Sequence, residues 1–298
     1  MNGARGRVKY IVFAFLAAVF YAVNIPFSKL LLERIDPTVM AALLYLGAGI
    51  GVGITSLFMR GDRARYEKLG RSDLPYVIGM IVLDIFAPIL LMFGLKYGTS
   101  SSASLLGNFE IAATAVIALI FFKEAVSKRL WLAIALITLA SAILSLNGTE
   151  SLHFSMGSLF VLLAAVCWGL ENNCTRKISS KNTYQIVVLK GIFSGLGSLI
   201  IALIIGESFP LFGYAAAALA LGFVSYGLSI FLYVRSQSVL GAAKTSACYA
   251  AAPFVGAFLS FVFLREQLTL TYFIALAVMI AGTVFVVLDT LKNEQRRS

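Results

Sequence analysis

Charged side chains are scarce in this chain. Only 13% of its 298 residues are Asp, Glu, Lys or Arg, whereas 60% are hydrophobic. A soluble globular domain has about 25% charged and about 45–50% apolar residues, so this composition excludes a soluble protein. We therefore predict an integral membrane protein, and the short polar stretches leave no room for a separate soluble domain.

Histidine and cysteine, which often bind metals, are also nearly missing. The single histidine, His153, has no partner cluster, and Cys167, Cys174 and Cys248 have no CxxC spacing. We interpret the cysteines as small buried apolar residues and expect neither a metal nor a cofactor. The hydrolase motifs HExxH and GxSxG do not occur, so the sequence does not predict an enzyme.

Apolar runs of about 20 residues follow one another along the whole chain, separated by short polar, glycine- or proline-containing joints. Each run is long enough to cross a hydrocarbon core of about 30 Å as a helix. Transmembrane β-strands would instead alternate polar and apolar residues in segments of about ten. The first run is followed at once by others, so we expect no cleaved signal peptide. The sequence predicts an all-α membrane protein with ten transmembrane helices, at residues 10–32, 38–59, 74–95, 99–122, 130–146, 156–178, 184–205, 212–234, 242–264 and 270–288.

The formal net charge of +10 gathers in the joints at one end of the predicted helices. Basic residues precede the first span and form a cluster from Arg60 to Arg71, whereas few, such as Arg34 and Arg265, fall at the other end. Cytoplasmic loops carry this excess of Lys and Arg. We interpret the charge as an orientation signal that places both termini in the cytoplasm, expect a bacterial inner membrane, and expect no nucleic-acid partner.

The second half of the sequence repeats the first. Residues 122–124, Phe-Lys-Glu, align with residues 264–266, Leu-Arg-Glu, and a long apolar run follows both. In the first span of each half, Asn24 aligns with Glu171. Glycines at GxxxG spacing, which lets helices approach closely, match in the second spans: Gly47 and Gly51 align with Gly191 and Gly195.

We therefore divide the chain into two five-helix units, at residues 1–148 and 149–298. Because five is an odd number, the second unit must enter the membrane upside down relative to the first. Inverted repeats of this kind are typical of secondary transporters, in which a site near the bilayer midplane is exposed to either side in turn.

Four short motifs in the second half carry a family resemblance. They are Trp168-Gly169, Pro253, the Phe-Leu-Arg-Glu of residues 263–266, and Gly282-Thr283. In their order and spacing they resemble the drug/metabolite transporter superfamily, in its EamA-type branch of ten helices. The resemblance implies that the first, third, fourth, sixth, eighth and ninth spans surround a central cavity, and that solutes cross by alternating access.

The first half departs from this pattern at two places. Tyr21-Ala22 stands where the second half has Trp-Gly, and Ile111 stands where it has Pro253, with Glu110 immediately before it. Members of the resembled superfamily handle amino acids, other metabolites, nucleotide sugars and drugs. The resemblance therefore implies a small-molecule substrate without specifying which one.

Five ionisable residues fall inside the predicted spans: Asp84, Glu110, Glu171, Lys190 and Lys244. A charge at the bilayer centre costs about 2.5–3.5 kcal/mol on insertion scales, so such residues are functional candidates by default. Asp84 and Glu110 lie at similar depth on consecutive spans, and we expect them to face each other. Glu171 and Lys190 lie at matched depth across the next hairpin, and we expect them to pair.

Each of these residues also has a structural interpretation. Glu171 and Lys190 can form an ion pair that only fixes helix register, Lys244 can snorkel to the cytoplasmic surface, and Asp84 can hydrogen-bond a neighbouring hydroxyl. Glu110 is the hardest to explain by packing alone, because it is central and follows a serine-rich stretch.

A wet cavity shared by Glu110 and Asp84 would give Glu110 a function. Repulsion between two carboxylates favours a proton on one of them, and the pair can then bind either a coupling proton or a cationic group of the substrate. Prolines at positions 26, 88 and 253 allow bends in the cavity-forming spans. The other candidate lining residues are Asn108, Tyr21, Tyr226, Tyr249, Trp168, Asn24 and Asn172.

The sequence favours a secondary active transporter that exports amino-acid-like or other small charged metabolites. The mixture of acids and lysines in the spans suits a substrate with both an amine and an acid group. The alternative is a proton-coupled exporter of organic cations or drugs. A membrane-embedded lipid enzyme and a channel are less favoured, because neither a catalytic motif nor a ring of like charges is recognisable. The expected partners are the substrate and the lipid bilayer, and a homodimer is left open.

Overall fold

The fold is a bundle of helices. The computed structural model describes residues 2–58, 67–123, 126–147, 153–240, 245 and 248–295. Besides helices, these residues contain one pair of two-residue strands, β1 (Leu146–Asn147) and β2 (His153–Phe154). The first half comprises α1 (Asn2–Leu31), α2 (Pro37–Phe58), η1 (Arg71–Asp73), α4 (Leu74–Tyr97), α5 (Ser100–Leu106), α6 (Phe109–Phe122) and α7 (Lys128–Ser145). The second half comprises α8 (Met156–Ile178), α9 (Thr183–Ile205), α10 (Phe212–Gly222), η2 (Phe223–Leu228), α11 (Ser229–Leu240), α13 (Ala252–Leu264) and α14 (Leu270–Gln295).

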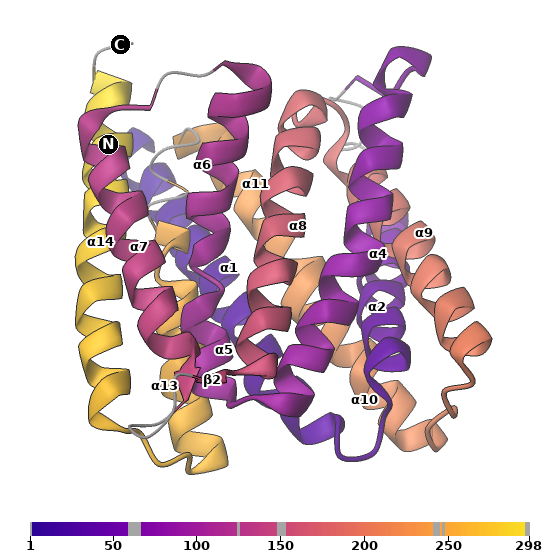
Figure 1. Cartoon of the computed structure of the whole chain (residues 1–298). Coiled ribbons are helices and arrows are strands. Elements are labelled where there is room, and N and C mark those ends of the chain that lie inside the picture. Colours follow the sequence, from indigo (N-terminus) through magenta and orange to yellow (C-terminus); the bar gives the residue numbers. More distant parts are fainter. Residues whose placement is uncertain are drawn as a thin grey trace.

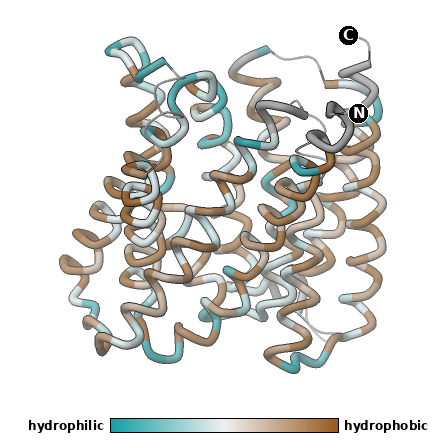
Figure 2. Tube along the Cα trace, turned by 180° about the vertical axis from the view of Figure 1, so that it is seen from behind, coloured by the Kyte–Doolittle hydropathy of each residue, from teal (hydrophilic) through white to brown (hydrophobic). Residues whose placement is uncertain are grey.

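The predicted all-α membrane fold is confirmed. Nine segments of the described chain are long and apolar enough to cross a bilayer, and the shorter apolar helix α13 takes the place of the ninth predicted span. Hydrophilic residues gather at the two ends of the bundle and hydrophobic residues along its middle (Figure 2). The helix axes therefore run along the expected membrane normal.

Both ends of the chain lie at the same end of the bundle, and the β1–β2 pair lies at the opposite end (Figure 1). Helix α1 starts at the end that carries the termini, whereas α8 starts at the β1–β2 end and runs the other way. The first helices of the two halves are thus antiparallel. We call the end that carries β1, β2, α5 and α13 the distal end.

The two halves make equivalent packing contacts. Helix α2 packs against α9, and α7 packs against α14, so equivalent helices of the two halves meet. Helix α1 packs against α11 and α13, as α8 packs against α4 and α6. The inverted relation between the halves stays a prediction, which these reciprocal contacts support.

Glycines allow the closest contacts between helices. A Cβ added to Gly191 of α9 would lie 2.4 Å from the Cα of Gly49 of α2, and one added to Gly47 would lie 2.1 Å from the carbonyl oxygen of Leu219 of α10. Gly191 therefore packs on Gly49, whereas Gly47 faces a different helix. Helix α2 uses two glycine faces at once, one toward α9 and one toward α10.

The fourth predicted span is not a continuous helix. It breaks at Gly107-Asn108, between α5 and α6, and a turn likewise precedes α13. The equivalent C-caps of α6 and α13, Lys123 and Arg265, both adopt left-handed conformations, with φ of 52° and 51°. The expectation of one helix over residues 99–122 is thus wrong at its centre, where glycine lowers helix propensity and asparagine favours a turn.

Candidate functional site

A buried cluster of three charges joins the helices α4, α8 and α9. The ammonium Nζ of Lys190 lies 3.0 Å from Oδ2 of Asp84 and 3.0 Å from Oε1 of Glu171. Asp84 is 0% and Glu171 is 2% exposed. The predicted pair of Glu171 and Lys190 is present, and Asp84 joins it as a second carboxylate.

Hydroxyl groups complete this charge cluster. The Tyr45 hydroxyl donates a hydrogen bond of 2.8 Å to Oδ1 of Asp84, and the Thr175 hydroxyl donates to Oε1 of Glu171. Buried charges persist where such hydrogen bonds and opposite charges replace the lost water. With one ammonium between two carboxylates, the cluster carries one negative charge in excess when both acids are ionised.

The expectation that Asp84 faces Glu110 is wrong. Asp84 contacts Lys190 and Tyr45, whereas Oε1 of Glu110 accepts a hydrogen bond of 2.6 Å from Nδ2 of Asn172. Counting residues from a joint gives the depth of a side chain but not its direction around the helix axis. The count also assumed that the fourth span is one straight helix. The break between α5 and α6 shows that it is not.

Glu110 occupies the first turn of α6, just after the break. The same Nδ2 atom of Asn172 lies 3.4 Å from the hydroxyl oxygen of Thr114, which is one turn further along α6. In the described part of the chain, no Lys or Arg lies within ion-pair distance of Glu110. The residue as a whole is half-buried.

Five tyrosines form a continuous aromatic cluster in the bundle. The ring centroids of Tyr45 and Tyr226 lie 5.1 Å apart, those of Tyr226 and Tyr21 6.0 Å, those of Tyr21 and Tyr249 5.8 Å, and those of Tyr249 and Tyr233 5.0 Å. The rings come from α1, α2, η2, α11 and the segment before α13. We call these residues the tyrosine cluster.

The tyrosine cluster reaches the charge cluster through Tyr45, whose hydroxyl donates to Asp84. Aromatic faces attract ammonium groups, and a carboxylate attracts them with a full opposite charge. Glu110, which has no ion-pair partner among the described residues, can therefore bind a cationic group.

Comparison with known proteins agrees with this membrane architecture. A family model described as the EamA-like transporter family matches residues 8–146 and again residues 155–288. The chain belongs to the EamA-like transporter family. It is thereby a transporter of the drug/metabolite transporter superfamily, as the sequence motifs indicate.

Two individual proteins resemble this EamA-like transporter over most of its length. A protein of Methanothermobacter thermautotrophicus described as an uncharacterized transporter is 26% identical over 288 residues, which cover 89% of this chain and 82% of the relative. A solved structure described only as a crystal structure of a protein superposes with a TM-score of 0.67 at 16% identity. It covers 95% of this chain and 97% of its own, and it shows the same fold.

The other sequence-predicted residues of the EamA-like transporter take different places. Asn24 is fully buried and donates a hydrogen bond of 3.1 Å to the Tyr226 hydroxyl, so it belongs to the tyrosine cluster's surroundings. Trp168 packs in the large buried apolar cluster that also contains Tyr226. Asn108 lies at the helix break, and the amide that hydrogen-bonds Glu110 is that of Asn172. Lys244 falls outside the described residues, as do Glu124 and the basic positions 60–66.

Sequence reasoning missed several residues of this region. Tyr45, Thr175 and Thr114 each touch an embedded acid or its amide partner, and Tyr233 extends the tyrosine cluster. Thr175 follows Glu171 by one helical turn, which a search for i, i+4 partners of each embedded charge would have found. No local signal marks Tyr45, because its partner lies on another helix.

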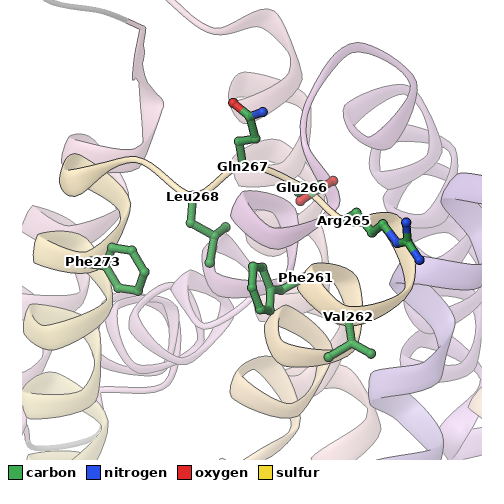
Figure 3. A pocket seen from close by; sticks show the side chains of 7 residues that line it. All are labelled: Phe261, Val262, Arg265, Glu266, Gln267, Leu268 and Phe273. Atoms are coloured by element: carbon green, nitrogen blue, oxygen red, sulfur yellow. The ribbon is translucent and has the colours of Figure 1, made fainter.

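Two hollows lie at the ends of the bundle. One, of about 410 Å³, is lined by residues between Leu69 and Val77 and by Gln185 and Leu189. The other, of about 470 Å³, lies at the distal end between α13 and α14, where Leu268 lies between the rings of Phe261 and Phe273 (Figure 3). Neither hollow is lined by Asp84, Glu110 or Glu171, so the embedded acids lie apart from both.

Proposed function

We propose that this EamA-like transporter exports amino-acid-like or other small charged metabolites by alternating access. The observation that carries the proposal is Glu110, a carboxyl group in the middle of a broken span that no cation of the described chain neutralises. Together with Asn172 it offers a place for the substrate's ammonium group.

One observation favours the alternative, a proton-coupled exporter of organic cations. The lysines in the spans suited an acid group on the substrate, but Lys190 already lies 3.0 Å from two protein carboxylates. A substrate with an ammonium group but no acid group then fits the described residues as well. Both candidates share the ammonium group at Glu110 and differ in what binds the rest of the molecule.

Uptake into liposomes tests the two candidates. Purified protein in liposomes is offered a pooled mixture of amino acids, amines and organic cations, with and without a pH gradient, and the accumulated compounds are identified by mass spectrometry. Accumulation of zwitterionic amino acids supports the first candidate, and gradient-dependent accumulation of cations alone supports the second. Accumulation of anions only would contradict an ammonium site at Glu110.

The orientation in the membrane gives a separate prediction. With both termini in the cytoplasm, the α1–α2 joint at the distal end faces outward and the α8–α9 joint faces inward. We expect a membrane-impermeant maleimide to label Glu33→Cys in intact cells and Ser180→Cys only after the membrane is opened, since both positions are exposed. Labelling of Ser180→Cys in intact cells would refute this orientation.

A further inference from the structure

The helices α5 and α13 meet along a face of small and polar residues at the distal end of the bundle. The hydroxyl groups of Ser100 and Ser260 lie 2.9 Å apart. One turn further inward, a Cβ added to Gly256 would lie 3.0 Å from Oγ of Ser104. We call this contact of Ser100 and Ser104 with Gly256 and Ser260 the α5–α13 seam; it joins the first half of the chain to the second.

A carboxylate holds the distal end of this seam. Glu266, just after α13, accepts hydrogen bonds from the backbone N–H groups of Ser100, at 2.7 Å, and Ser101, at 2.8 Å. These two amides start α5, where a helix exposes unpaired N–H groups and favours a negative charge. Glu266 thus ties the end of α13 to the beginning of α5.

A lysine holds the other side of the same joint. Nζ of Lys29 in α1 donates a hydrogen bond of 2.7 Å to the carbonyl oxygen of Gly98 and another to that of Leu95, at the end of α4. Two charged side chains therefore bind the joint between α4 and α5: Lys29 bonds the carbonyl groups at the end of α4, and Glu266 bonds the amide groups at the start of α5.

Polar atoms without partners lie behind the seam. Oγ of Ser104 and Nδ2 of Asn108 are buried, each residue being 1% exposed, and neither has a hydrogen-bond partner in the described part of the chain. Buried polar groups are normally paired, because leaving one unpaired costs its full desolvation. Ser100 and Ser104 lie one turn apart on α5, and Asn108 lies at the break just before Glu110, so the three residues lead from the distal end toward Glu110.

The seam differs from the middle of the contact between α7 and α14, which is apolar. There, Gly282 packs on Ile137, and both Ile137 and Met279 are fully buried in an apolar cluster. Water cannot replace such apolar contacts without loss, whereas it can replace the hydrogen bonds of Glu266 and Ser100. Water can therefore satisfy the polar groups of the seam if its two helices separate.

We propose that the α5–α13 seam is the distal gate of the transporter. Glu266 and Lys29 hold it closed, and when it parts, Ser100, Ser104 and Asn108 line the solute's path between the distal surface and Glu110. The gate rests on the proposed transport function. Opening gives water to the polar atoms of Ser104 and Asn108, which offsets the loss of the hydrogen bonds at Glu266.

Cysteine labelling tests the gate without any knowledge of the solute. The reporter is Ser104→Cys, treated with a membrane-impermeant maleimide from the distal side and compared with the parent chain, which has three cysteines of its own. Adding Glu266→Gln removes the charge and one of the two acceptor oxygens. We expect labelling to become about tenfold faster, as the loss of one charge-assisted hydrogen bond implies.

Glu207→Gln is the matched control. Glu207 accepts hydrogen bonds from the amides of Thr38, at 3.2 Å, and Val39, at 2.8 Å, at the start of α2, which is outside the seam. We expect this variant to leave the labelling of position 104 unchanged. Equal acceleration by both glutamine variants would mean general loosening and would overturn the gate, as would no acceleration by Glu266→Gln.

Ser260→Ala gives the same test if Glu266→Gln does not fold. It removes the hydrogen bond with Ser100 and adds no volume. Faster labelling at position 104 then supports the gate, and unchanged labelling overturns it.

The labelling test and the liposome test separate the gate from the proposed substrate. If labelling responds as expected but the protein accumulates no ammonium compound in liposomes, the gate is supported and the proposed substrate is refuted. Failure of the gate and failure of the proposed function are therefore distinguishable.

Discussion

Lys190→Met is expected to lower the free energy of unfolding by about 3–5 kcal/mol, the usual cost of removing one partner from a buried ion pair. The change leaves Asp84 and Glu171 buried without the ammonium that lies 3.0 Å from each. Thermal unfolding of the detergent-solubilised protein, followed by size-exclusion chromatography after heating, measures the loss.

Lys181→Met is the control for this prediction. Lys181 pairs with Glu67 at 2.6 Å, but the side chain of Glu67 is 78% exposed, so solvent screens the pair and its loss is expected to change stability little. Combining Lys190→Met with Asp84→Asn and Glu171→Gln is expected to restore much of the stability, because no buried charge then lacks a partner. If Lys190→Met unfolds at the same temperature as Lys181→Met, the cluster does not stabilise the fold.

A double-mutant cycle separates the pair of Glu171 and Lys190 from the rest of the cluster. Since their charged atoms are in contact, we expect the losses of Glu171→Gln and Lys190→Met not to add, with a coupling energy of about 0.5–3 kcal/mol. Additive losses would show that the two charges act independently.

Glu110→Gln is expected to reduce transport by about 30-fold or more while the protein still folds. Glutamine keeps the shape and can still accept the hydrogen bond from Asn172, but it removes the charge that the substrate's ammonium group needs. Losing one partner of a desolvated charge contact costs about 2–5 kcal/mol, which corresponds to this factor. Uptake into liposomes, measured at several pH values, gives the rate and its pH dependence, which we expect to disappear together.

Two comparisons make this prediction specific. Glu207→Gln, at the distal end, is expected to transport at the parental rate. Asp84→Asn is expected to disturb the charge cluster, because Asp84 contacts Lys190 and Tyr45 and not Glu110; its main effect should be on stability. Parental transport by Glu110→Gln, with an unchanged pH profile, would make Glu110 a structural residue.

The sequence by itself determined the class of the protein and the position of its helices along the chain. A span is recognised from about 20 apolar residues in a row, which is a local property of the sequence. The match of Glu171 with Lys190 was equally accessible, because the two residues flank one short joint and the hairpin fixes their depth. The motifs around Trp168 and Pro253 pointed to the family to which the chain belongs.

Only the tertiary structure decided which embedded groups meet. Asp84 contacts Lys190 and Tyr45, whereas Glu110 accepts a hydrogen bond from Asn172. The rings of the tyrosine cluster come from five separate segments. Successive side chains on a helix point about 100° apart, so a shift of one residue, or a break such as the one at Gly107, turns a side chain toward another neighbour. Hydropathy gives the depth of a residue in the membrane, but its direction around the helix axis is set by the packing of all the helices together.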